Sequence, residues 1–169
     1  MSEEDIVQRI ATGVYPYVDW AARDCLAMLG ACESPIERIL GASFLLCARL
    51  GTLKFKVCGH LEQEKYAKEF TCLIVPQYPW NGYRIDFAFV MPDFKNGLTF
   101  VECDGHQFHE RTPDQAARDR SKDRKAQEAG IPILRFTGRE IYRDPVACVD
   151  QIGKFLTRGA DGPNSQHQA

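Results

Sequence analysis

The chain has 169 residues, of which 44% are hydrophobic and 26% are charged, as is typical of a single globular domain. A formal net charge of -2 excludes a uniformly basic binder of nucleic acid, but it leaves room for a local basic groove because a field depends on charge distribution. No apolar run is long enough for a transmembrane helix, and the acidic N-terminus lacks a signal-peptide core, so we expect a cytoplasmic protein.

The seven cysteines are irregularly spaced and form no C-x-x-C pair, which is typical of reduced thiols in a reducing compartment. The spacing of Cys103, His106 and His109 resembles that of zinc ligands. A structural zinc site needs four ligands, however, and no second pair lies nearby in the sequence. We therefore favour buried thiols over a zinc site.

Composition and apolar pattern divide the chain into three parts. Residues 1–33 predict an N-terminal helical extension, which Gly13 and Pro16 interrupt. Residues 34–156 carry the regular apolar segments of one domain. Residues 157–169 turn to Gly, Asp, Asn, Ser and Gln, and they predict a flexible tail.

A strong helix start stands at Ser34, with proline next and Glu37 three residues on, and the helix is predicted to reach about Leu50. Two interpretations of Glu37 remain open. It serves only the cap, or it lies beside acids of the sheet and helps to bind a metal ion or its water.

Residues 52–68 are polar and predict a surface connection that contains a helix or short strands. Strand composition returns at 70–76, and the pair Asn81 and Gly82 favours positive φ angles, which predicts a hairpin turn. The hairpin would place Gln77 beside Asp86, where its amide could orient a water molecule or contact a phosphate.

Two strands, predicted at 84–90 and 98–104, carry carboxylates inside apolar runs. If the strands are neighbours, Asp86, Glu102 and Asp104 converge at one end of the sheet. Carboxylates that are so close repel one another strongly, and a divalent cation that prefers oxygen ligands is the simplest way to neutralise them.

Strict alternation along the first of these strands puts Asp86 and Ala88 on one face and Ile85 and Phe87 on the other. In the alternative interpretation, the three acids simply occupy the wet face of a half-exposed antiparallel pair. The three acids and the histidines directly after them together favour a functional site.

Thr112 and the proline after it predict a further helix, which ends near Gly130. Residues 111–125 contain six basic and three acidic side chains, so this helix is either a solvated face or a surface that holds the phosphates of a polyanion.

Residues 131–136 predict a strand that returns, by a βαβ crossover, beside the strand at 98–104. A last helix follows from residue 137, with an interruption at Asp144. Its helical spacing predicts that apolar side chains face the core. These are Val146, Val149, Ile152, Phe155 and Leu156.

The order of these elements, with the runs RIDFAF, LTFVECDGHQFHE and QAARDRSKDRKAQEAGIPILRFTGREI, resembles the PD-(D/E)XK, or restriction-endonuclease-like, superfamily. Within it, the sequence is most similar to the compact branch related to very-short-patch-repair endonucleases. The resemblance spans about Ser34 to Phe155. It implies an α/β fold with a central mixed sheet flanked by helices. It also implies a DNA endonuclease that depends on Mg²⁺, for which Mn²⁺ substitutes.

The resemblance also implies roles for individual residues. Asp86 and Glu102 match the acids of the family motif and would bind the metal ion, together with the backbone carbonyl of Cys103. Glu37 matches a helix acid that some members add. The motif lysine is replaced here by Asp104, so another group must take its place in catalysis.

For that substitute, His109 or His106 could accept a proton. One of the basic residues of the following helix, Lys122, Arg118 or Arg120, could supply the positive charge. Without a substitute, the chain would be a catalytically inactive nucleic-acid-binding relative. A structural or interaction domain is a third possibility. The candidate contacts to nucleic acid are Gln77, His106, Arg118, Arg120 and Lys122.

Overall fold

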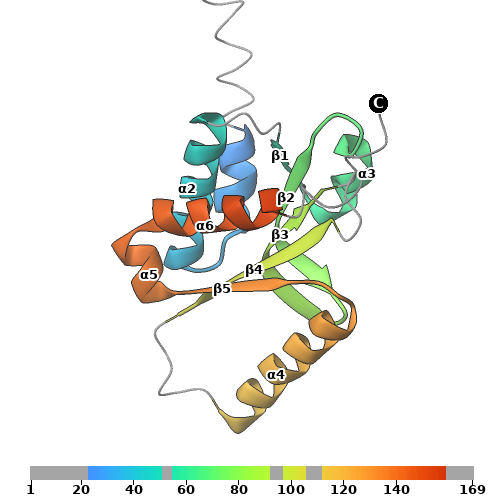
Figure 1. Cartoon of the computed structure of the whole chain (residues 1–169), viewed down its shortest axis with the longest axis vertical. Helices are drawn as coiled ribbons and strands as arrows, with labels where there is room; N and C mark the ends of the chain where they lie inside the picture. The colour runs from blue at the N-terminus through green and yellow to red at the C-terminus, as the bar shows by residue number, and fades with distance from the viewer. Residues whose placement is uncertain (1–22, 51–54, 92–96, 106–111, 159–169) are drawn as a thin grey trace, which may run out of the picture.

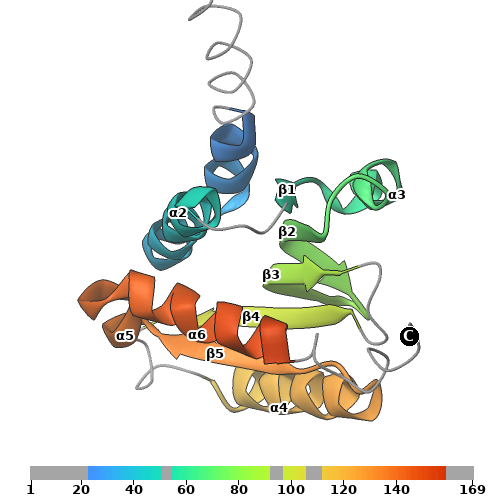
Figure 2. The same ribbon diagram turned by 45° about the horizontal axis from the view of Figure 1, so that its top comes forward.

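The structure of the protein, a computed structural model, describes residues 23–50, 55–91, 97–105 and 112–158 (Figure 1). These residues form a five-stranded mixed sheet in the order β1-β2-β3-β4-β5, with helices packed on both faces (Figure 2). The predicted α/β class is thereby confirmed. The elements are α2 (Pro35–Leu50), β1 (Phe55–Val57), η1 (His60–Glu62), α3 (Gln63–Tyr66), β2 (Cys72–Trp80), β3 (Tyr83–Val90), β4 (Leu98–Asp104), α4 (Pro113–Glu128), β5 (Ile133–Thr137), α5 (Gly138–Arg143) and α6 (Pro145–Arg158).

Helices α2, α5 and α6 lie on one face of the sheet, and α4 lies on the other (Figure 2). Strand β4 pairs antiparallel with β3 and parallel with β5, so α4 is the predicted crossover between two parallel neighbours. No helix among the described residues is long and apolar enough to cross a membrane. All seven cysteines are free thiols, as their spacing predicted.

The helix starts follow the capping signals of the sequence. The backbone N–H of Glu37 donates to Ser34 Oγ at 3.3 Å, and Ser34 N–H donates to Glu37 Oε1 at 3.2 Å, which closes a capping box. Thr112 and Gln115 form the same reciprocal pair at the start of α4. The turn between β2 and β3 has positive φ at Asn81 and Gly82, 48° and 77°, as predicted for this hairpin.

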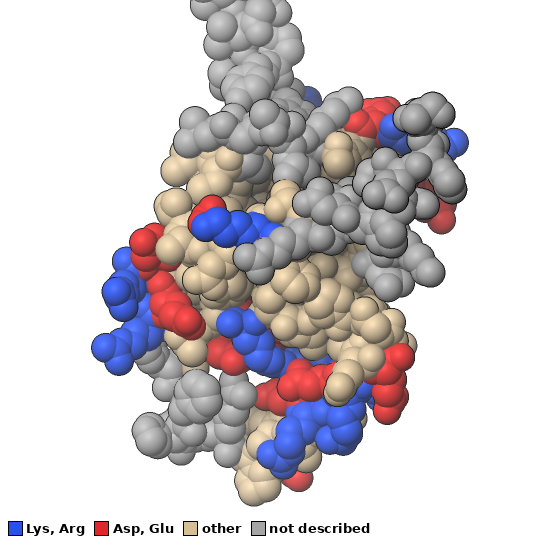
Figure 3. Space-filling model, viewed as in Figure 1, with Lys and Arg blue, Asp and Glu red and all other residues tan. Residues whose placement is uncertain are grey.

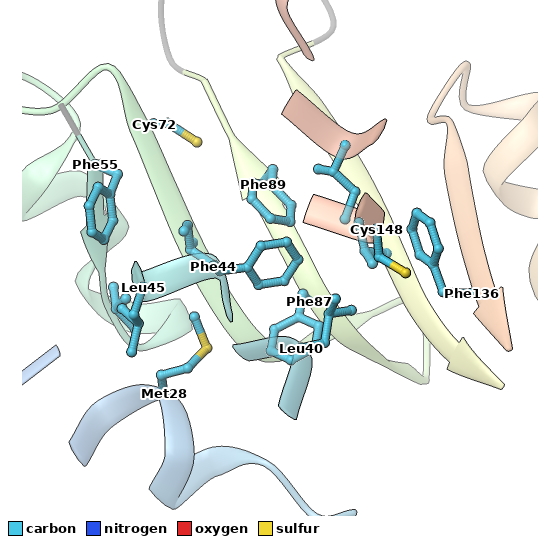
Figure 4. Packing of buried hydrophobic residues seen from close by; sticks show 14 of the residues in the cluster. Met28, Leu40, Phe44, Leu45, Phe55, Cys72, Phe87, Phe89, Phe136 and Cys148 are labelled. Atoms are coloured by element: carbon cyan, nitrogen blue, oxygen red, sulfur yellow. The ribbon is translucent and has the colours of Figure 1, made fainter. Parts of the chain in front are cut away.

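Phe44 of α2 is the centre of the larger core, between the sheet and the helices (Figure 4). Its ring centroid lies 5.4 Å from that of Phe87 and 5.1 Å from that of Phe89, and both pairs meet edge to face. The helical residues 23–31 join the same core through Met28. A Cβ on Gly41 would come within 2.9 Å of Met28 Cγ. The glycine at this point of α2 therefore lets the Met28 side chain pack closely against the helix backbone.

We expect Phe44→Ala to lower the free energy of unfolding by about 3–5 kcal/mol, because the deleted ring leaves a cavity between helix and sheet. Urea denaturation followed by circular dichroism measures this difference. Leu46→Ala on the same helix is the matched control, since Leu46 is 58% exposed. Equal losses in the two variants would contradict the placement of Phe44 at the centre of the core.

The prediction for the last helix is correct in part. Ile152 and Leu156 are buried and Val149 packs against the core, but Val146 and Phe155 are 49% and 39% exposed. Helix α6 covers the sheet with one narrow stripe of side chains. Residues beside that stripe therefore face solvent in spite of their helical spacing.

The three-part division of the chain stays a prediction. Most of the helical extension and of the tail, residues 1–22 and 159–169, lies outside the described residues.

Candidate active site

The candidate site forms where β3 leaves its regular path. The β3–β4 ladder ends at the pair Phe87 and Val101, so Asp86 is not paired across to Glu102. On the other side of β3, Gln77 has a φ of 51° at the position opposite Asp86. The strands therefore part at Asp86, and its side chain lies between them.

This departure overturns the predicted division of β3 into two faces. Ile85 packs in the smaller core with Ala88 and Phe100, whereas Phe87 packs in the larger core against α2. Strict alternation would have put Ile85 and Phe87 on the same face. The irregular backbone around Asp86 shifts the alternation by one residue.

Asp86 accepts a hydrogen bond from the backbone N–H of Cys103 to its Oδ2 at 2.7 Å. Burial raises the pKa of Asp86 to about 7 from its ordinary 3.8, and the negative charges of Glu102 and Glu37 add to the increase. The Cys103 N–H and the Lys122 ammonium partly oppose it. Asp86 thus lies close enough to the carboxylates of Glu102 and Glu37 for their negative charges to raise its pKa.

We expect Asp86→Asn to stabilise the fold above neutral pH. Wild-type Asp86 keeps its proton to about pH 7 in the folded state, whereas the unfolded chain loses it near 3.8, so wild-type stability falls between these values. The gain from Asp86→Asn should therefore rise from pH 4 to pH 7 and level off at no more than about 4 kcal/mol. Urea titrations in EDTA at pH 5 and pH 8 measure it. A gain that is equal at both pH values would contradict the raised pKa.

Glu102 forms a buried ion pair with Lys122 of α4. Lys122 Nζ lies 2.6 Å from Glu102 Oε2, and the residues are 7% and 6% exposed. Burial raises the pKa of Glu102, while the charge and hydrogen bond of Lys122 lower it. The other oxygen, Glu102 Oε1, is buried and has no hydrogen-bond partner among the described residues.

Lys122 brings a positive charge to Glu102. In the family motif, a lysine two residues after this acid supplies such a charge, and Asp104 occupies that position here. The sequence predicts Lys122 both as a possible substitute for the motif lysine and as a contact to nucleic acid, and does not decide between the two roles. The structure turns it inward, beside Ala126 on the buried side of α4. The four-residue spacing of Lys122 and Ala126 was the available signal, because it places both on one face of a helix.

Asp104 turns to another partner. Arg135 of β5 lies 3.3 Å from Asp104 Oδ1 and 2.5 Å from Asp123 Oδ1 of α4. No group of three or more His, Cys, Asp or Glu side chains among the described residues is arranged to hold a metal ion. The predicted convergence of Asp86, Glu102 and Asp104 around one ion stays a prediction. Strand alternation places Glu102 and Asp104 on one face of β4, where Asp104 pairs with Arg135 and Glu102 with Lys122.

Glu37 is buried and serves the helix cap as one interpretation predicted. Its carboxylate accepts the N–H groups of Glu33 and Ser34, at 2.9 and 3.2 Å. The amide of Gln77 also donates to Glu37 Oε2 at 2.6 Å. This contact ties the irregular part of β2 to α2 beside Asp86. A role of Glu37 in binding a metal ion or its water stays a prediction.

The remaining candidates contact other groups, face solvent or lie outside the described residues. Arg118 donates to the carbonyl of Gly82 at 3.0 Å, and Arg120 is exposed. His106 and His109, the predicted proton acceptors, lie outside the described residues.

Asp86 and Glu102 fit a magnesium ion. Mg²⁺ is usually bound by one or two carboxylates, with waters and substrate phosphates as the other ligands, so a third protein acid is not required. The buried and unpartnered Glu102 Oε1 is an oxygen of the kind that such an ion binds. The backbone carbonyl of Cys103, predicted as a further ligand, stays a prediction.

Comparisons with known proteins identify a family for most of the chain. The model of the REase_MTES_1575 family matches residues 56–156, a range that contains Asp86, Glu102 and Lys122. An uncharacterized protein of Haemophilus influenzae (strain ATCC 51907 / DSM 11121 / KW20 / Rd) is 32% identical over 80 residues, 47% of this chain. The chain covers 60% of the length of that relative. No solved structure is significantly similar to the chain.

Proposed function

The chain belongs to the REase_MTES_1575 family of restriction endonuclease-like domains, and on that premise we propose that it is a Mg²⁺-dependent endonuclease that hydrolyses phosphodiester bonds in DNA. One observation carries the proposal: the buried Glu102–Lys122 pair lies beside Asp86, whose pKa is strongly raised. Burying an ion pair beside a half-buried carboxylate is costly, and ionisable groups of this kind cluster at functional sites.

Asp86 and Glu102 would hold the ion, which when bound polarises the scissile phosphate and activates a water for attack. The Cys103 N–H fixes one oxygen of Asp86, so the other oxygen keeps a defined orientation. The charge and hydrogen bond of Lys122 favour the ionised form of Glu102, against the effect of burial on its pKa. The ammonium of Lys122, 2.6 Å from Glu102 Oε2, would counter the charge that develops on the phosphoryl oxygens.

The main alternative is a catalytically inactive relative that only binds nucleic acid, which the sequence favoured because Asp104 occupies the lysine position. The position of Lys122 supports the active enzyme instead. A lysine that reaches the second acid from α4 supplies the charge that the strand lacks. Asp104, in contrast, is paired with Arg135.

Incubating the purified chain with supercoiled plasmid and with single-stranded DNA tests the proposal. We expect nicked or linear products in Mg²⁺ or Mn²⁺ and none in EDTA, because the acids need the ion to activate water. Binding without cleavage in either metal would support the inactive relative. Neither binding nor cleavage at about 50 mM salt would support an interaction domain.

Closer kinship to very-short-patch-repair endonucleases and a cytoplasmic location stay predictions. Both agree with the proposed function without adding support to it.

A further inference from the structure

A small basic and aromatic surface lies beside the candidate site, where the β2–β3 hairpin meets α4. We call it the hairpin–helix surface. Its members are Tyr83, Arg118, Ser121 and Lys125.

Tyr83 holds this surface together. Its hydroxyl donates to Ser121 Oγ at 3.1 Å. Lys125 Nζ lies over the ring, 5.0 Å from its centroid, and the guanidinium carbon of Arg118 lies over it at 5.6 Å. Arg118 also donates to the carbonyl of Gly82 in the turn at 3.0 Å. Two exposed cations are therefore kept close together on one aromatic ring.

The two sides of α4 differ in charge. Arg118 and Lys125 are seven residues apart, almost two full turns, so they share one side of the helix. Lys122 lies between them along the axis and points to Glu102. The side that faces Arg135 carries Asp123 instead. Asp123 and Arg135 offset each other in charge, whereas Arg118 and Lys125 bring two exposed positive charges to the side of α4 that meets the β2–β3 hairpin.

On the face that Figure 3 shows, basic and acidic side chains of the described residues are interspersed. With a formal net charge of -2, binding to DNA requires a local group of ordered cations.

We propose that the hairpin–helix surface binds the phosphodiester backbone of duplex DNA and leads it to the Glu102–Lys122 pair. The inference rests on the proposed nuclease function and names the surface on which its substrate lies. Two cations already cover the Tyr83 ring, so the surface fits phosphate contacts better than the stacking of bases. Because the ring orders both side chains before binding, less entropy is lost when they meet the phosphates.

Fluorescence anisotropy with a labelled duplex of 20 base pairs, in EDTA and at 50 to 300 mM NaCl, tests the proposal. We expect Arg118→Gln/Lys125→Gln to bind at least about tenfold more weakly at the lowest salt. The plot of log affinity against log salt should become shallower by about 1.8, since each lost phosphate contact removes about 0.9. We expect Tyr83→Ala to weaken binding roughly threefold to tenfold with little change in slope, because it removes the ring and no charge.

Arg124→Gln is the matched control, since Arg124 is an exposed cation on another side of the same helix. Circular dichroism melts confirm that each variant is folded. The proposal is wrong if the double variant keeps the wild-type slope, if Arg124→Gln lowers the slope as much, or if the wild type does not bind the duplex. Plasmid cleavage by the wild type is scored separately. Cleavage with unchanged slopes refutes the surface alone, and changed slopes without metal-dependent cleavage refute the nuclease alone.

Discussion

Asp86→Asn is expected to lower the rate of Mg²⁺-dependent DNA cleavage by at least about 100-fold, although the variant should be more stable than the wild type at pH 8. The amide keeps the shape of the side chain and still accepts the Cys103 N–H, so the backbone around it has no cause to move. It carries no negative charge, however, and it binds a divalent cation poorly.

Opposite changes in activity and stability distinguish this result from simple damage to the fold. Initial rates of plasmid nicking and urea titrations on the same preparation measure both quantities. Asp150→Asn is the matched control, because Asp150 is 58% exposed on α6 and its change should alter neither quantity appreciably. Wild-type cleavage by Asp86→Asn would remove Asp86 from the proposed site.

Lys122→Met is expected to lower the free energy of unfolding by about 3–5 kcal/mol at pH 8, because it leaves the Glu102 carboxylate buried without its counter-charge. Cleavage should fall as well, by about 100-fold or more. The pKa of Glu102 is already raised by burial and should rise further without Lys122. Protonation then removes the unpaired charge, so the loss of stability should shrink as the pH falls toward 5.

A double variant separates the two roles of Lys122. Lys122→Met/Glu102→Gln buries no unpaired charge, so it should recover much of the lost stability but no activity. Lys154→Met, which changes a 66% exposed lysine on α6, is the control for the loss of a surface charge. If Lys122→Met is as stable and as active as Lys154→Met, the ion pair has neither role.

Much of the fold could be predicted because its signals are local. The serine, proline and glutamate of residues 34–37 predicted the start of α2, and Thr112 predicted that of α4, because a cap is satisfied by neighbours in the sequence. The pair Asn81 and Gly82 predicted the hairpin turn for the same reason. Apolar spacing predicted the strand after α4 and its return beside β4.

The site was predictable only in part, because its contacts join distant segments. Sequence alone pointed to Asp86 and Glu102, since acids inside apolar strands are unusual. Alternation failed at Asp86, where the parting of the strands depends on the conformation of a neighbouring strand. The partners of Glu102 and Asp104 lie 20 and 31 residues away, and several basic residues were equally eligible for each.

Because Lys122 comes from a helix and not from the strand that bears Glu102, the charge balance of the two acids depends on how α4 is docked. If α4 undocks while the sheet stays folded, Asp86 and Glu102 lose the positive charge of Lys122. Such a molecule would lose DNA cleavage before it unfolds. The rate of cleavage would then depend on whether α4 is packed against the sheet. A compound that loosens this packing would inhibit cleavage without contacting Asp86 or Glu102.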